Sequence, residues 1–298
     1  MDAAALPAWV NGAWVAPGAP AIAADDQGLQ LGMSVFDSLL WEAGRLRFLD
    51  LHMERLASGA AELGIAFGSA GDALAGALHP RVALEAYMEH LTAERDWRDP
   101  LMLKVTVTRG RPGGSPTVLV TARRPEPLDA GGVVVALAEV QKAAGDHHEH
   151  IKSTNRMRNV LALEDARAHG AWEALFTTTD GLLSEGTMTN LFVVLPGGRI
   201  KTPALEHGCL SGITRLVLLR ELERVGTAVE EGAVTLAELA AAEEAFLTNT
   251  SQRAVPIRAV QRPGGEIFAT NLLAERPVAR RARELVLAAE AAEAASSP

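Results

Sequence analysis

The chain has 298 residues, of which 48% are hydrophobic and 22% charged, so it is long enough for a sizeable core and has the composition of a soluble globular protein. Its net charge of -9 and its pI near 5.4 argue against nucleic acid as the main partner. The single cysteine, Cys209, excludes an intramolecular disulfide framework and suits a reducing compartment.

The N-terminal residues favour a hairpin and not an export signal. They show no basic segment followed by an apolar core, and no run in the chain approaches the roughly 18 apolar residues that span a bilayer. We therefore expect a cytoplasmic protein with no membrane partner. Residues 9–15 (WVNGAWV) place an Asn-Gly pair between two apolar stretches, which is typical of a two-residue hairpin turn.

A strand, a turn at Glu42-Ala43-Gly44, a second strand and a helix are predicted between residues 25 and 65. The helix is expected to begin near Leu49, with Asp50 as its N-cap. Residues 72–98 follow as two predicted helices with polar faces.

The next segment is predicted to end one domain and open another. Strands are expected at 101–108 and 117–121, around a loop at 109–115. Two closely spaced prolines, Pro125 and Pro127, then block both helix and central strand. The predicted organisation is a small N-terminal domain over residues 1–123, a linker over 124–131 and a larger domain over 132–298, which begins with a strand at 132–137.

One of only four lysines in the chain, Lys152, lies between apolar Ile151 and a predicted helix that stops at Gly170. The capping candidates for this helix are Ser153, Thr154 and Asn155. Two strand-like runs follow, and turn signals separate them. The runs are 174–178 and 190–195, and the turn signals are Asp180-Gly181 and Ser184-Glu185-Gly186.

The C-terminal part reads as a glycine-led helix followed by alternating elements. Ser211-Gly212-Ile213-Thr214 precedes a helix that Gly226 ends, and the free N–H groups of such a helix start suit an anion, although a plain capped helix is the simpler interpretation. The remaining predicted elements are a helix at 235–243, strands at 245–248 and 255–260, a Gly264-Gly265 turn and a last helix at 277–292.

A histidine-rich run, Asp146-His147-His148-Glu149-His150, has some of the composition of a metal site. Adjacent histidines in a short polar run are more typical of a solvated loop, and no second ligand cluster with zinc-site spacing accompanies them. We therefore predict no metal.

The segment from Lys152 to Phe192 resembles the signature of the class IV (fold type IV) pyridoxal-phosphate enzymes, which include branched-chain and D-amino-acid aminotransferases and aminodeoxychorismate lyase. The resemblance implies an α/β (α+β) fold of two domains, with the cofactor pyridoxal 5′-phosphate at their interface. It also implies that Lys152 forms the Schiff base with the cofactor and that Glu185 contacts its pyridine nitrogen.

The chemistry explains this pairing of residue types. A lysine amine attacks an aldehyde only when it is neutral, so a catalytic lysine needs a desolvated or otherwise altered environment. A carboxylate beside the ring nitrogen keeps that nitrogen protonated, and the protonated ring is the electron sink for a substrate carbanion. Taken alone, Lys152 would be interpreted as a solvated lysine and Glu185 as a carboxylate in a turn.

Three further segments resemble the family's phosphate-binding motifs. His52-Met53-Glu54-Arg55-Leu56 implies that Arg55 contacts the phosphate, for which a planar guanidinium is well suited; His52 would either support that pocket or simply pack. The resemblance also assigns the phosphate to Gly212, Ile213, Thr214 and Thr250. The chain departs from the family in Gln27, where arginine is common, and in Met33-Ser34, where Asp-Gly is common.

The residues that bind the substrate carboxylate are less clear. The arginine and histidine that D-amino-acid aminotransferases carry in the loop at 109–115 are missing, so Arg111 of that loop is a candidate, with a solvated loop arginine as the alternative. Arg156, in an Asn-Arg pair that resembles aminodeoxychorismate lyases, would bind a carboxylate or the cofactor, or else pair on the helix surface. Phe36, which matches an aromatic of the family motif, is a third candidate.

We therefore predict an aminotransferase that exchanges an amino group between a D-amino acid or branched-chain amino acid and a 2-oxo acid. The alternative is aminodeoxychorismate lyase, which would eliminate pyruvate from the same covalent adduct. A binding protein that keeps the fold without catalysis is a third possibility, against which Lys152 and Glu185 argue. The resemblance also implies a homodimer that acts on small molecules.

Overall fold

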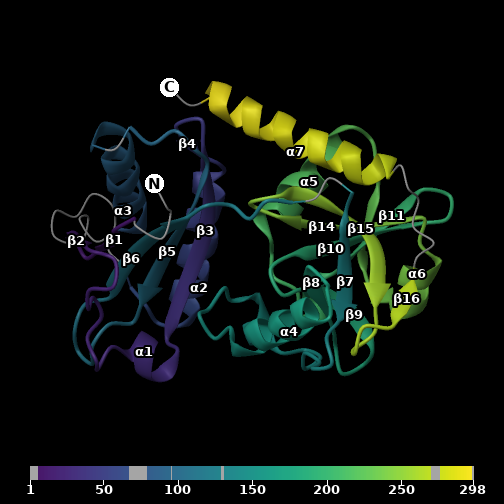
Figure 1. Ribbon diagram of the computed structural model, residues 1–298, viewed down its shortest axis with the longest axis horizontal. Coiled ribbons are helices and arrows are strands. Elements are labelled where there is room, and N and C mark those ends of the chain that lie inside the picture. Colours follow the sequence, from purple (N-terminus) through teal and green to yellow (C-terminus); the bar gives the residue numbers. More distant parts are fainter. Residues whose placement is uncertain (1–5, 67–78, 95, 129–130, 270–275, 297–298) are drawn as a thin grey trace. The chain divides into compact units, whose positions relative to one another are not determined.

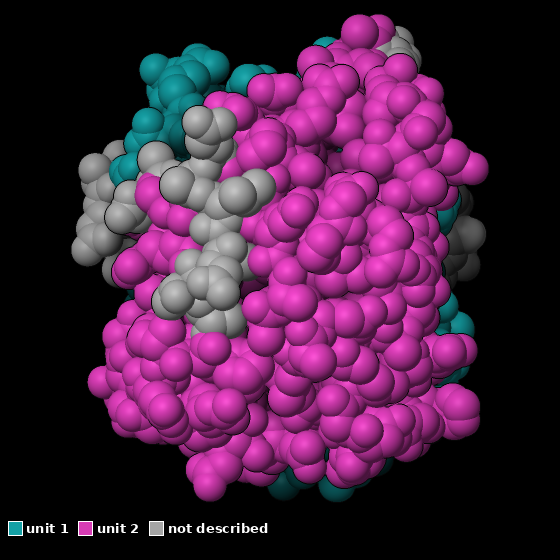
Figure 2. Space-filling model, turned by 90° about the vertical axis from the view of Figure 1, so that its right-hand side faces the viewer, with its two compact units in different colours: residues 1–126, 151–155 teal, residues 127–150, 156–298 magenta. Residues whose placement is uncertain are grey.

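The computed structural model describes residues 6–66, 79–94, 96–128, 131–269 and 276–296. Its contacts divide the chain into two compact units, coloured separately in Figure 2. Unit 1 comprises Met1–Glu126 and Ile151–Asn155, and unit 2 comprises Pro127–His150 and Arg156–Pro298. The chain thus returns to unit 1 for residues 151–155, which was not expected from the sequence.

Unit 1 is built on a six-stranded antiparallel sheet of order β2-β1-β6-β5-β3-β4, with helices α2 and α3 (Figure 1). Its elements are β1 (Ala8–Val10), β2 (Ala13–Val15), α1 (Gln27–Leu31), β3 (Ser34–Glu42), β4 (Arg45–Leu46), α2 (Leu49–Glu62), α3 (Pro80–Glu89), β5 (Leu101–Thr108) and β6 (Thr117–Arg123).

The core of unit 1 follows from the period of two along its strands. Val35, Leu39 and Trp41 of β3 are at most 1% exposed and pack in one cluster with Leu56 of α2 and Leu84 of α3. Because successive strand residues point to opposite faces, the residues between them point away from this cluster. That second face of β3 carries part of the candidate site.

The hairpin, the strand at 101–108 and the turn at 42–44 are confirmed. Asn11 and Gly12 both have positive φ, as a type I′ turn requires. The predicted cap of α2 was wrong: the N-cap is Phe48, in the left-handed region, and Asp50 already lies in the first helical turn, where it pairs with Arg81. Of the two helices predicted over 72–98, residues 72–78 lie outside the described residues, and α3 is followed by a π-helical turn at His90–Glu94.

Unit 2 is built on a ten-stranded mixed sheet with order β12-β11-β10-β14-β15-β7-β8-β9-β13, and β16 pairs with β15. Its elements are β7 (Val133–Leu137), α4 (Met157–Ala168), β8 (Glu173–Thr177), β9 (Leu182–Gly186), β10 (Asn190–Leu195), β11 (Arg199–Pro203), α5 (Ile213–Arg224), β12 (Val229–Gly232), β13 (Val234–Thr235), α6 (Leu236–Ala241), β14 (Glu244–Asn249), β15 (Arg253–Gln261), β16 (Ile267–Ala269) and α7 (Pro277–Ser296). Short 3₁₀ turns lie at His147–His150 and Leu205–His207.

Strand β7 runs through the middle of this unit and is buried on both faces. Val133 and Val135 join one apolar cluster, while Val134 joins a second cluster that contains Ala162 and Ala166 of α4. Its neighbours β8 and β15 both run parallel to it, and parallel strands covered on both sides read as continuous apolar runs. In the described part of the chain, no helix has the length and apolarity needed to cross a membrane.

Two local predictions in this unit were wrong. Helix α4 begins at Met157 with Arg156 as an N-cap that makes no side-chain cap hydrogen bond, because the predicted caps at 153–155 belong to unit 1. Ser184-Glu185-Gly186 lies within strand β9 and not in a turn. Gly186 is required by close packing, because a Cβ there would lie 2.1 Å from Thr189 Oγ1.

Candidate functional site

Lys152 lies in a short extended segment that pairs with the start of β3. Ser153 forms an antiparallel bridge with Val35, and the Phe36 amide donates to the Lys152 carbonyl at 2.9 Å. Ile151 is part of the core of unit 1. Since neighbouring residues of an extended segment alternate, Lys152 lies on the other face, with Phe36. Its backbone is therefore held by a sheet edge and not by a helix start.

The Phe36 ring contacts two lysine ammonium groups. Lys152 Nζ lies 5.0 Å from the ring centroid and Lys104 Nζ lies 4.3 Å from it. Phe36 pairs across the sheet with Thr106, two residues from Lys104, so these side chains share one face. The sequence analysis did not single out Lys104, although it is the one charged residue in a strand that otherwise contains apolar residues and threonines.

A buried cluster under helix α2 holds Arg55. Its guanidinium binds Asp37 at both carboxylate oxygens, with Nε to Oδ2 at 2.9 Å and one terminal nitrogen to Oδ1 at 2.7 Å. His52 Nδ1 lies 2.8 Å from the same Oδ1. Asp37 was not predicted, although a carboxylate at a core-facing position of β3 is the signal that could have found it.

The charges in this cluster are strongly coupled. Burial alone would raise the pKa of Asp37, but Arg55 and His52 outweigh it and hold that pKa well below its ordinary value. Burial lowers the pKa of His52 below its ordinary value, despite the opposing charge of Asp37. Arg55 therefore lies beside one buried carboxylate and one buried histidine ring.

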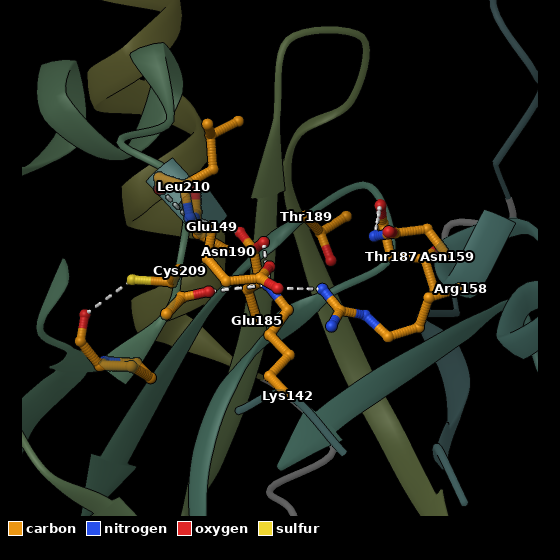
Figure 3. A network of polar contacts seen from close by, with 12 residues as sticks. Lys142, Glu149, Arg158, Asn159, Glu185, Thr187, Thr189, Asn190, Cys209 and Leu210 are labelled. Atoms are coloured by element: carbon orange, nitrogen blue, oxygen red, sulfur yellow. Dashed lines mark hydrogen bonds and ion pairs between the residues drawn. The ribbon is translucent and has the colours of Figure 1, made fainter. Parts of the chain in front are cut away.

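In unit 2, Glu185 projects from β9 into a network of polar side chains (Figure 3). Its Oε1 accepts from Lys142 Nζ at 2.7 Å, and its Oε2 accepts from the Leu210 amide at 2.9 Å and from Asn190 Nδ2 at 3.3 Å. The Glu185 residue is only 7% exposed. Three donors from different segments thus fix the carboxylate.

The network extends from Lys142 to the histidine-rich run. Lys142 Nζ lies 3.0 Å from Glu149 Oε2, and Glu149 also pairs with Arg158. The expectation of a solvated loop holds for exposed His147 and His148 but was wrong for Glu149, whose side chain turns inward. Across the described ranges, no three His, Cys, Asp or Glu side chains group as metal ligands would.

Fully buried Glu173 holds the loop between β9 and β10. It accepts from the amides of Ala174 and Met188 and from the hydroxyls of Thr187 and Thr189. The carbonyl of Thr187 in turn accepts from Asn159 at 3.1 Å and from the guanidinium of Arg156. The structure thus gives Arg156 a backbone partner, while its role toward a substrate stays a prediction.

Replacement of Glu173 with glutamine is expected to change how stability depends on pH. Burial raises the pKa of Glu173 above its ordinary value of 4.5. A carboxyl with a raised folded-state pKa stabilises the folded state most when protonated, so wild-type stability relative to the Glu173→Gln variant should fall as pH rises from about 4.5 through the folded-state pKa. Urea unfolding of both proteins over this range measures the difference; a constant difference would contradict the prediction.

The predicted phosphate residues of unit 2 lie at two chain reversals. The first-turn N–H groups of α5, at Ile213 and Thr214, have no acceptor within the helix. The N-cap residue, Gly212, has no side chain that could accept a hydrogen bond from them. A Cβ at Gly212 would lie 2.0 Å from Asn190 Oδ1, so only glycine fits there. Thr250 lies half-buried in the turn between β14 and β15.

Arg111, the other candidate for the substrate carboxylate, lies on the surface of unit 1. Its side chain is 67% exposed, and its Nε lies 2.8 and 2.9 Å from the two oxygens of Asp25. The structure therefore places Lys104, and not Arg111, against the ring that Lys152 contacts.

The family described as "Amino-transferase class IV" matches residues 34–260 of the chain. A D-alanine aminotransferase of Bacillus licheniformis is 31% identical over 80% of this chain and 83% of that protein. A putative branched-chain-amino-acid aminotransferase of Methanocaldococcus jannaschii is 29% identical over 84% of this chain and 86% of that protein. An aminodeoxychorismate lyase of Bacillus subtilis is 25% identical over 85% of this chain and 86% of that protein.

Solved structures support the fold. The PLP-bound form of a hypothetical aminotransferase from Mycobacterium tuberculosis superposes with a TM-score of 0.79 at 24% identity, covering 96% of this chain and 99% of that one. Class IV aminotransferases use pyridoxal 5′-phosphate as their cofactor. The expected α/β fold is thereby confirmed.

Proposed function

We propose that this chain, which belongs to the class IV aminotransferase family, transfers an amino group between an amino acid and a 2-oxo acid with pyridoxal 5′-phosphate held at Lys152. The observation that carries the proposal is the placement of Lys152. Its amine lies against the Phe36 ring at 5.0 Å, and its backbone is bound to a sheet edge. A lysine so held meets the first requirement for reaction with an aldehyde, because its position is fixed.

The chemistry of the donor groups fits the cofactor. Its aldehyde matches the amine of Lys152, and its phosphate matches Arg55, the first-turn N–H groups after Gly212 and the Thr250 hydroxyl. Its ring nitrogen matches the Glu185 carboxylate, which three donors orient. When bound there, the cofactor supplies an electron sink for the substrate α-carbon.

Each residue then has a defined task. Lys152 Nζ would hold the cofactor through its aldehyde, would release it to the substrate amine, and would then move a proton from the substrate α-carbon to the former aldehyde carbon. Arg55, itself oriented by both oxygens of Asp37, contributes a fixed positive charge toward the phosphate. Glu185 holds the proton on the ring nitrogen. The two half-reactions use one site in turn, which implies ping-pong kinetics.

A second candidate function is aminodeoxychorismate lyase. The Asn155-Arg156 pair and the 25% identity to the lyase of Bacillus subtilis favour it. The test is incubation with a panel of D-amino and branched-chain donors and a 2-oxo acid, compared with pyruvate release from aminodeoxychorismate. Amino transfer that follows ping-pong kinetics supports our proposal, whereas pyruvate release without an amino acceptor would replace it by the lyase.

We further propose that Lys104 binds the substrate carboxylate, and we expect Lys104→Met to raise KM about 10- to 100-fold, because a charge-assisted hydrogen bond contributes roughly 1.5–3 kcal/mol. Steady-state kinetics with both substrates measures this effect. Arg111→Ala is the matched variant, because Arg111 is the candidate drawn from the sequence. A larger rise in KM for Arg111→Ala than for Lys104→Met would assign the carboxylate to Arg111 instead.

We also propose that the protein is a cytoplasmic homodimer and that residues 124–131 link its two domains. The dimer is what the resemblance to the family implies, and a chain with a single cysteine, Cys209, suits a reducing compartment. Sedimentation of the purified protein tests the dimer, since a monomer at micromolar concentration would contradict it.

A further inference from the structure

Lys142 is a buried cation for which the reaction proposed above has no direct use. It is 1% exposed, and its ammonium contacts three oxygens. These belong to Glu185 at 2.7 Å, the Gly208 carbonyl at 2.7 Å and Glu149 at 3.0 Å. Lys142 thus donates two hydrogen bonds and forms one further ion pair, and its three partners come from three separate segments of unit 2.

The consequence for Glu185 can be counted. A carboxylate has about four acceptor positions, and the ammonium of Lys142, the Leu210 amide and Asn190 occupy three of them. One position is left for a donor from a ligand. The three donors thus limit the number of further hydrogen bonds that this carboxylate can accept.

The charges alternate along the network. Arg158 pairs with Glu149, Glu149 with Lys142, and Lys142 with Glu185, so two cations balance two anions. Because Glu149 shares the ammonium, Lys142 is held in place without being committed to Glu185 alone. Without Lys142, two carboxylates would share a buried site.

The same network reaches the start of α5. Asn190 Nδ2 donates both to Glu185 and to the Leu210 carbonyl at 2.9 Å, and its Oδ1 faces Gly212, the N-cap of α5. Lys142 also binds the Gly208 carbonyl in the segment that leads to this helix. Residues assigned to the ring nitrogen and to the phosphate are therefore joined through one set of hydrogen bonds within unit 2.

We propose that Lys142, held by Glu149, is a positioning residue that aims the Glu185 carboxylate at the ring nitrogen of the cofactor. This inference rests on the proposed function. It assigns Lys142 no contact with substrate or cofactor. Its effect is to give Glu185 one orientation with one acceptor position open.

The test compares the affinity of the apo protein for pyridoxal 5′-phosphate with its affinity for the 1-deaza analogue, in which C–H replaces the ring nitrogen. Attachment through the aldehyde is common to both ligands and cancels in the ratio of dissociation constants. We expect wild type to bind the cofactor about tenfold or more tightly than the analogue, since hydrogen bonds to charged groups are strong. Lys142→Met with Glu149→Gln, which keeps the site neutral, should bring the ratio to about one to two.

The matched control is Lys201→Met with Glu238→Gln. Lys201 is also buried, and its partners at 3.3 and 2.7 Å are Glu230 and Glu238, which lie outside the network. This control should keep the wild-type ratio, with thermal melting showing that both double variants fold.

An unchanged ratio in the Lys142 double variant would overturn the positioning role of Lys142 and leave the assignment of Glu185 intact. A wild-type ratio near one would instead remove the assignment of Glu185, and with it this part of the proposed function. Should the double variant not melt cooperatively, Glu149→Gln alone keeps the ammonium but removes the second carboxylate that holds it. That variant should lower the ratio about threefold, because Lys142 is then less firmly placed beside Glu185, and no change would overturn the inference.

Discussion

Replacement of Lys152 with alanine is expected to lower turnover by about 10⁴-fold or more, because in the proposed function this one group both holds the cofactor and moves the proton. The absorbance band that depends on covalent attachment of the cofactor should disappear as well. The fold should survive, because the core contribution of this segment comes from Ile151 and its sheet bonds come from the backbone. Steady-state turnover and the absorbance spectrum measure the two effects.

The control for this prediction is Lys104→Met. It removes the other ammonium that contacts the Phe36 ring, so it tests whether any loss of charge near that ring produces the same result. The band should persist in this variant. A band that survives in the Lys152→Ala protein would refute the assignment of the amine.

Replacement of Asp37 with asparagine is expected to lower the free energy of unfolding by about 3–5 kcal/mol, because it leaves the Arg55 charge without its buried partner.

The pKa of Asp37 also predicts how the free energy of unfolding depends on pH. Burial opposes ionisation, but Arg55 and His52 lower the folded-state pKa below the ordinary value of 3.8. A lowered carboxyl pKa stabilises the folded state above 3.8 and loses that contribution as pH falls below it. Urea unfolding between neutral and acid pH measures both effects.

The matched variant is Asp25→Asn, which breaks the exposed pair with Arg111. An exposed pair contributes roughly 0–1 kcal/mol, so this variant should unfold almost as wild type does. Equal losses in the two variants would contradict the claim that burial of Asp37 makes the difference. The Asp37→Asn variant should also bind the phosphate of the cofactor less tightly, since Arg55 loses the carboxylate that orients it.

Local patterns predicted much of the fold. The strand at 101–108, the strand at 190–195 and the glycine-led start of α5 match the structure, because each depends on residues adjacent in the chain. Lys152 and Glu185 were assigned through their resemblance to a family signature. Their roles in this chain stay predictions.

Features that depend on distant partners could not be predicted. Residues 153–155 have the composition of a helix cap, but the competing hydrogen bonds come from β3, more than a hundred positions earlier. Lys142 shows no local signal, since its partner Glu185 is 43 positions away. Asp37 stands out only after the core-facing side of β3 is known, because only then is it seen as a carboxylate at a buried position.

The segment at 151–155 also limits how this architecture can be divided or recombined. A fragment that ends at Glu126 would expose the β3 edge that the Lys152 carbonyl and Ser153 cover, and exposed strand edges invite association with other chains. A chimera that takes its first 126 residues from a relative would likewise combine the β3 edge of one parent with the Lys152 segment of the other. Exchange of the first 126 residues therefore separates Lys152 from the strand edge that fixes its backbone, although both belong to unit 1 and only residues 127–150 between them belong to unit 2.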